Sequence, residues 1–127
     1  MNDALNALGE QLIGAAMRVH TALGPGLLES SNEVCLCHEL VKLGVAVKRQ
    51  HPLPIVYDGV QLEAGYRLDL LINDRVVVEI KTVDRFLPVH TAQLLSYLRL
   101  GNFKLGYLLN FHVLSMRDGV KRVVNNF

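Results

Sequence analysis

The sequence predicts an α/β fold in which a mixed central β-sheet is flanked by helices. Apolar residues recur at helical spacing in two N-terminal segments and again after Pro88, whereas the segments between and after them follow the two-residue period of strands. A short Asn-Asp turn joins two of the strand-like segments into a hairpin. The predicted order is helix, helix, three antiparallel strands, helix, strand, strand, which gives helices packed on the faces of one sheet.

The first helix is predicted over residues 2–23, with Asn2 or Asp3 as its cap and a Gly-Pro-Gly stop. A second helix is predicted over residues 27–43, where Gly44 ends it. The third begins after the proline and stops at a glycine near position 101. The apolar pattern of the second helix predicts a buried side formed by Leu28, Val34, Cys35, Leu40, Val41 and Leu43.

The strand-like segments begin after the second helix. Residues 45–50 and 54–57 form an interrupted strand that prolines kink, which is typical of a sheet edge. An Asp-Gly turn leads into a strand predicted over residues 60–72, and the Asn-Asp turn leads into a strand over residues 76–83 that is apolar enough to be central. The third helix returns the chain, so the next strand can run parallel to its neighbour. The last two strands are predicted over residues 105–111 and 119–124.

Composition sets broad limits on function. The chain has 127 residues, half of them apolar, which predicts one domain over residues 1–127. The net charge of +1 gives no indication of a polyanion partner. The sequence shows no signal peptide and no apolar run that could span a bilayer, so we expect a cytoplasmic protein without a membrane partner. Cys35 and Cys37 point to different sides of a helix and have no second pair with which to form a zinc site.

Charged residues gather on the predicted hairpin. Folding it places Asp69 level with residues 78–80, while Glu79 and Lys81 point to one face of the second strand. Two convergent carboxylates repel each other unless a cation lies between them, and oxygen ligands suit Mg²⁺ or Mn²⁺. A lysine beside such a metal can position or deprotonate a water. The alternative is a cross-strand ion pair of Lys81 with Glu79 or Asp69.

The helix that follows the hairpin carries a polar stripe. Gln93 and Tyr97 are four residues apart and share a face that can lean over the charged patch. An amide and a phenol there can bind phosphate oxygens or hold a carboxylate. The alternative is an ordinary exposed helix face. Glu29 opens the second helix, where its simplest role is to complement the helix dipole.

These residues resemble a known family. Asp69 with Glu79-Ile80-Lys81 is similar to the core of the PD-(D/E)XK nuclease superfamily, and Gln93 with Tyr97 resembles the Gln-x-x-x-Tyr element of its RecB-like and phage-exonuclease branches. The segments LGPGLLE, GYRLDLLI, QLLSYLRL and LLNF are similar to the small bacterial GxxExxY proteins. The resemblance covers nearly the whole chain.

The resemblance implies a restriction-endonuclease-like core and a metal-dependent nuclease that acts on nucleic acid, most simply DNA. Asp69, Glu79 and the Ile80 carbonyl would hold Mg²⁺ or Mn²⁺, and Lys81 would activate the water. Gln93 and Tyr97 would support the phosphate, and Glu29 would act through the metal's water shell.

The chain departs from the family pattern at two positions. The name-giving tyrosine falls at Asn32, and the proline before the first aspartate is Leu68. A second hypothesis therefore stays open, in which the chain keeps the fold but cuts weakly or not at all and serves in nucleic-acid or protein binding. Open edges at the last strand and at the proline-kinked strand also predict a homodimer or a complex with a protein partner.

Overall fold

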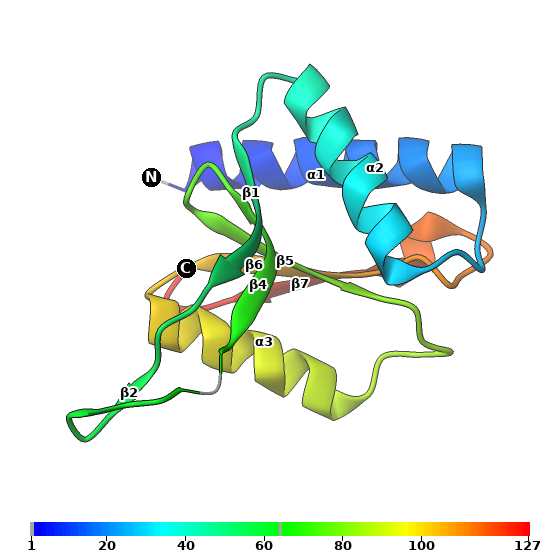
Figure 1. Cartoon of the computed structure of the whole chain (residues 1–127). Coiled ribbons are helices and arrows are strands. Elements are labelled where there is room, and N and C mark those ends of the chain that lie inside the picture. The colour runs from blue at the N-terminus through cyan, green and yellow to red at the C-terminus, as the bar shows by residue number, and fades with distance from the viewer. Residues whose placement is uncertain (1, 64) are drawn as a thin grey trace.

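The computed structural model describes residues 2–63 and 65–127 of the chain (Figure 1). The helices are α1 (Asp3–Leu23), α2 (Glu29–Lys42), α3 (Pro88–Gly101) and the short 3₁₀ helix η1 (Met116–Gly119). The strands are β1 (Val47–Pro52), β2 (Val56–Tyr57), β3 (Val60–Gln61), β4 (Arg67–Ile72), β5 (Val76–Lys81), β6 (Leu105–Asn110) and β7 (Val120–Val124).

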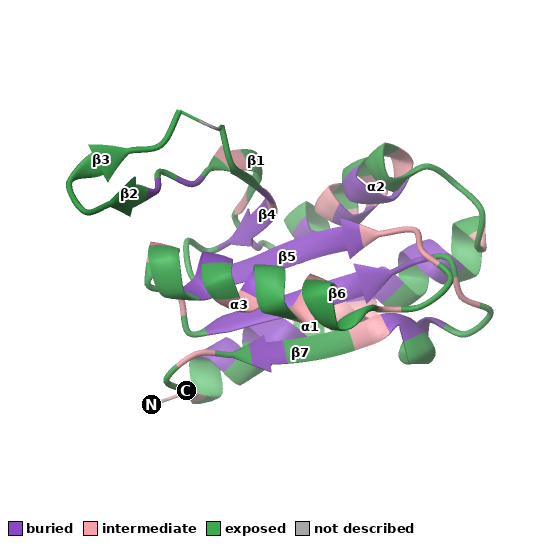
Figure 2. Cartoon of the chain, turned by 90° about the horizontal axis from the view of Figure 1, so that it is seen from below, coloured by how far each residue is buried: buried purple, intermediate pink, exposed green. Residues whose placement is uncertain are grey.

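Five of the strands form one mixed sheet in the order β1-β4-β5-β6-β7. The β5–β6 pair is parallel and the other pairs are antiparallel. Helices α1 and α2 cover one face and α3 covers the other (Figures 1 and 2). Because α3 carries the chain from the end of β5 back to the start of β6, these two strands run in the same direction. The predicted α/β fold with a mixed central sheet is confirmed.

Two apolar layers enclose the sheet. Val76, Val78 and Ile80 of β5 pack in the core beneath α1 and α2, whereas Val77 packs in the core beneath α3. Strand β5 is buried from Val76 to Ile80 and β6 is buried along its whole length, so the parallel pair forms the centre of the molecule. The prediction that the hairpin's second strand is central is confirmed.

The prediction of which side of α2 is buried is largely wrong. Leu28, Val34, Val41 and Leu43 are exposed, and only Leu40 of the larger predicted apolar residues is buried. The helix instead buries Asn32, Glu33, Leu36 and Leu40, which share a face at helical spacing. Because Asn32 and Glu33 are polar, the hydrophobic pattern does not identify this face as buried. The exposed apolar residues Val34 and Val41 instead make the outer face look like the buried one.

The strand predicted over residues 60–72 is two separate strands. Strand β3 pairs only with β2 in a ribbon that projects from the sheet (Figure 1), and β4 begins at Arg67. Gly65 lies between them with a φ of 68°, a left-handed conformation that favours glycine. The predicted interrupted strand is likewise divided, with β1 in the sheet and β2 in the ribbon.

The ends of the elements also differ from prediction. Strand β5 stops at Lys81 because the next two amides donate to side chains, Thr82 N to Glu29 and Val83 N to Asn110. Asn2 occupies the N-cap position of α1 but makes no capping bond; its Nδ2 donates to the carbonyl oxygen of Phe127 at 2.8 Å.

Strands β1 and β7 lie at the two edges of the sheet, as predicted. Their pairing with another chain stays a prediction. In the part of the chain that the structure describes, no helix combines the length and apolar character needed to cross a bilayer.

The buried amide of Asn32 leads to a stability prediction. Its side chain is 1% exposed, and among the described residues neither Oδ1 nor Nδ2 has a hydrogen-bond partner. An unsatisfied buried polar group costs about 1–3 kcal/mol, so Asn32→Leu should raise the free energy of unfolding by about 1 kcal/mol. Urea denaturation measures the change, with Val34→Leu on the exposed face of the same helix as a control that should change little. A clear loss of stability in Asn32→Leu would show that the amide has a partner.

Candidate functional site

The site begins where β4 and β5 stop pairing with each other. Their ladder joins only residues 70–72 to residues 76–78. Beyond it, the amide of Asp69 donates to Glu79 Oε2 at 2.8 Å, and the amide of Ile80 donates to Asp69 Oδ2 at 2.7 Å. Each carboxylate thus binds the backbone of the opposite strand. The predicted convergence of Asp69 and Glu79 is observed.

Burial gives this pair of carboxylates unusual electrostatics. Burial raises the pKa of Glu79 to about 8, and the neighbouring charge of Asp69 raises it as well, against the opposing effects of the Asp69 amide and Lys81. Burial also raises the pKa of Asp69, with Glu33 acting in the same direction and the bond from Ile80 N opposing it. Two carboxylates held close together away from water favour protonation or a bound cation.

Lys81 lies at the end of β5, where its side chain is partly buried. Its positive charge lowers the pKa of both Asp69 and Glu79. Among residues 2–63 and 65–127, however, no salt bridge includes Lys81. The alternative of a cross-strand ion pair with Glu79 or Asp69 is therefore not what the described structure contains.

Gln93 and Tyr97 lie on α3, on the other face of the sheet. Gln93 Nε2 donates to Tyr97 Oη at 3.2 Å. Tyr97 is 8% exposed and packs edge-on against Tyr66 at a ring-centroid distance of 6.3 Å. Burial raises the pKa of Tyr97, and the charges of Glu79 and Asp69 act in the same direction. The alternative of an ordinary exposed helix face therefore holds for Gln93, which is exposed, but not for Tyr97, which is buried.

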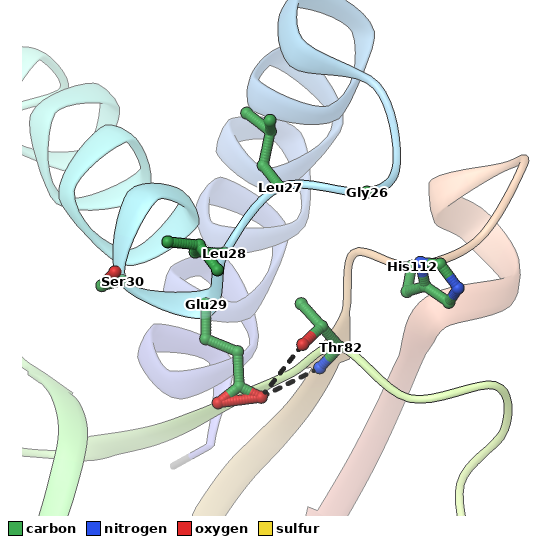
Figure 3. Close-up of a pocket in the computed structure, with 7 residues that line it drawn as sticks. All are labelled: Gly26, Leu27, Leu28, Glu29, Ser30, Thr82 and His112. Carbon is green, nitrogen blue, oxygen red and sulfur yellow. Dashed lines mark hydrogen bonds between the residues drawn. The ribbon is translucent and has the colours of Figure 1, made fainter.

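Glu29 reaches the site from the first turn of α2. Its Oε2 accepts hydrogen bonds from Thr82 N at 3.0 Å and from Thr82 Oγ1 at 3.4 Å (Figure 3). Since Thr82 follows Lys81 directly, Glu29 ties α2 to the end of β5. A pocket of about 240 Å³ lies beside it, lined by Glu29, Ser30, Glu33, Gln50, Asp69 and Ile80.

Three residues of this region were missed by the sequence prediction. Glu33 is buried, and its Oε2 accepts from Arg49 Nε at 3.1 Å and Nη2 at 2.9 Å. Gln50 Nε2 donates to Glu33 Oε1 at 2.8 Å and to Asp69 Oδ1 at 3.4 Å. Glu33 follows Glu29 by four residues and so shares its helix face, a signal that could have found it. Nothing in the sequence pattern of an edge strand indicates Arg49 or Gln50.

A larger cleft of about 570 Å³ adjoins the pocket and shares Glu29 and Ser30 with it (Figure 3). It is lined by Gly26, Leu27, Leu28, Glu29, Ser30, Thr82 and His112. The two hollows therefore meet at Glu29, and the larger one reaches Thr82, the residue after Lys81.

The oxygen donors of the site suit a hard divalent cation. Across residues 2–63 and 65–127, no three His, Cys, Asp or Glu side chains are grouped so as to hold a metal ion. Mg²⁺, however, commonly uses one or two carboxylates and keeps several waters. Asp69 and Glu79 form such a pair, and the 240 Å³ pocket that Asp69 lines has room for several waters of about 30 Å³ each. The residues present fit such a cation.

Comparison with known proteins gives the family. One solved structure that matches, titled "Crystal structure of SSO0001", has a TM-score of 0.46 and 17% sequence identity, and the alignment covers 94% of this chain and 79% of that one. No curated protein matches the chain significantly. The family described as "PD-(D/E)XK nuclease superfamily" matches residues 6–123, which include all of the site described above. The chain belongs to the PD-(D/E)XK nuclease superfamily.

Proposed function

We propose that the chain is a metal-dependent nuclease that hydrolyses phosphodiester bonds, with DNA as its substrate. The observation that carries this proposal is the pair of the half-buried Asp69 and the buried Glu79 beside Lys81. Among the described residues, Lys81 has no salt-bridge partner. Membership of the superfamily supports a nuclease. Because members of the superfamily generally depend on divalent metals, it also supports a metal-dependent reaction. The Gln93–Tyr97 pair and residues 23–29 support placement in the RecB-like branch and among the GxxExxY proteins.

The metal would be Mg²⁺ or Mn²⁺, held by Asp69, Glu79 and the carbonyl of Ile80, with Glu29 acting through a water. When bound, such a cation polarises phosphoryl oxygens and makes a bound water more acidic. Glu79 and Asp69 would hold it with their full charge once deprotonated. The hydrogen bonds that Ile80 N donates to Asp69 and that Asp69 N donates to Glu79 orient both carboxylates before the cation binds.

The other side chains would act on water and phosphate. Lys81 would orient the attacking water and stabilise the negative charge that develops on the phosphoryl oxygens. The Tyr97 hydroxyl and the Gln93 amide would donate hydrogen bonds to those oxygens. The adjoining 570 Å³ cleft offers room for part of the substrate strand beyond the reacting phosphate.

A second candidate is a module that keeps the fold but cuts weakly or not at all, and acts in nucleic-acid or protein binding. The unpartnered amide of Asn32, where the GxxExxY pattern has a tyrosine, favours this candidate. Lys81 weighs against it, because a lysine beside a buried and a half-buried carboxylate, with no salt bridge among the described residues, has no evident structural task. The experiments below separate the two candidates.

Metal binding should depend on Glu79. Mn²⁺ at about a hundred times its dissociation constant should stabilise the wild type by about 2.7 kcal/mol, seen as a rise in melting temperature. Glu79→Gln keeps the shape but loses the charge, so its melting temperature should respond far less. Asp74→Asn, at the far turn of the hairpin, is the matched control and should respond like the wild type. An equal rise in Glu79→Gln would remove Glu79 from the site.

Lys81 should matter for turnover more than for metal affinity. Lys81→Met keeps much of the side-chain length but loses the charge, so we expect at least about a hundredfold lower cleavage rate with unchanged Mn²⁺ affinity. Rates on labelled single- and double-stranded DNA and RNA, with Mn²⁺ or with EDTA, provide the measurement. Full activity in Lys81→Met would contradict the role given to the lysine, and no cleavage by the wild type would favour the second candidate.

Without metal, stability should fall as pH rises. A Glu79 pKa of about 8 in the folded chain, above its ordinary value of 4.5, means that the fold retains a proton that the unfolded chain loses. The free energy of unfolding should therefore decrease between about pH 4.5 and pH 8. Urea denaturation in EDTA across this range measures it, and Glu79→Gln should flatten the slope. A wild-type stability that is constant or rises with pH would contradict the assigned environment of Glu79.

A further inference from the structure

Gln50 has an unusual backbone for its position. It lies inside β1 with a φ of 50°, in the left-handed region that L-residues other than glycine, asparagine and aspartate rarely adopt. The other described residues with positive φ are glycines or belong to the tolerant types: Asp58, Asn73, Asp74, Asn102 and Asn126. Such a conformation persists only where the surrounding structure requires it.

The left-handed backbone turns the side chain of Gln50 toward α2. Arg49 and Gln50 are consecutive, yet both donate to the carboxylate of Glu33. In a regular strand, successive side chains point to opposite faces, so this arrangement requires a local twist. The register is the same on both sides, Arg49 with Leu70 and His51 with Leu68, so no residue is inserted; the absent pair is Gln50 with Asp69.

The side-chain amide of Gln50 contacts two carboxylates, those of Glu33 and Asp69. Nε2 lies 2.8 Å from Glu33 Oε1 and 3.4 Å from Asp69 Oδ1. Ionised carboxylates only accept hydrogen bonds, so the amide nitrogen must face both of them. The other oxygen of Asp69, Oδ2, accepts from Ile80 N. Two neutral donors, Gln50 Nε2 and Ile80 N, thus orient the two oxygens of Asp69, while the charged guanidinium of Arg49 pairs with Glu33.

We propose that Gln50 is a positioning residue whose left-handed backbone is kept because it orients Asp69 for a divalent cation without neutralising its charge. This inference rests on the proposed metal-dependent function. An arginine or lysine in the same place would compete with the cation for Asp69, and an apolar residue would leave Oδ1 free to turn. Partners that orient a metal ligand typically change metal affinity by about 10–100-fold when they are lost.

Two variants separate the amide from the backbone. Gln50→Asn suits a left-handed backbone better but is one methylene too short to reach both carboxylates. Gln50→Met keeps the length and loses the donor. We expect Mn²⁺ affinity, measured by titration calorimetry, to fall about 10-fold or more in both, with melting temperatures in EDTA within a few degrees of the wild type. Asn102→Ala, another left-handed position, at the end of α3, is the control and should lose stability while keeping Mn²⁺ affinity.

Each outcome decides a different claim. Weakened Mn²⁺ binding in both Gln50 variants, with the folded state intact, supports the proposal. Wild-type affinity in Gln50→Met, with or without a loss in Gln50→Asn, would overturn the positioning role of the amide while leaving the metal site in place. A wild type that binds no Mn²⁺ would overturn the proposed function and this inference together.

Discussion

The hydrogen bonds by which the carboxylates of Asp69 and Glu79 each accept a backbone amide of the opposite strand are the constraint on which the site depends. At the point where β4 and β5 cease to pair, each carboxylate accepts the amide of the opposite strand, Asp69 N to Glu79 and Ile80 N to Asp69. These bonds satisfy backbone donors that would otherwise be lost at the end of the ladder. They also bring the buried Glu79 and the half-buried Asp69 together, and two negative charges so placed are costly unless a proton or a cation compensates.

The layers of the fold explain why other residues can reach this pair. Helix α2 lies on one face of the sheet and α3 on the other (Figures 1 and 2), so side chains of both helices can approach the sheet. From α2 come Glu29, which binds Thr82, and Glu33, which accepts from Gln50. From α3 comes Tyr97, whose pKa is raised by its burial and further by the charges of Glu79 and Asp69. Side chains from α2 and α3 are therefore available to the strands β4 and β5 where their pairing ends.

Much of this arrangement could be predicted from the sequence, because its signals are local. The hairpin follows from two apolar runs and an Asn-Asp turn, and the parallel β5–β6 pair follows from the helix between them. The residues Asp69, Glu79 and Lys81 lie on that hairpin, and Gln93 and Tyr97 follow on the next helix. Pairing within the hairpin brings Asp69 and Glu79 together without contacts from distant parts of the chain.

Other parts could not be predicted, because tertiary contacts decide them. The buried face of α2 carries Asn32 and Glu33, so hydrophobicity points to the wrong side of the helix. Glu33 is accommodated there by Arg49 and Gln50, whose pairing with it requires a left-handed residue inside a strand. A strand predicted over residues 60–72 treats β3 and β4 as one, since alternation alone does not show where a ribbon leaves the sheet.

The most direct test of the account is a crystal structure of the protein with Mn²⁺, using the anomalous signal of the metal to locate it. The account predicts a peak between β4 and β5, about 2.1 Å from oxygens of Asp69 and Glu79 and from the Ile80 carbonyl, with water completing the shell. A map without metal there, in crystals that keep both carboxylates on the amides of Asp69 and Ile80 at saturating Mn²⁺ and pH above 8, would contradict it.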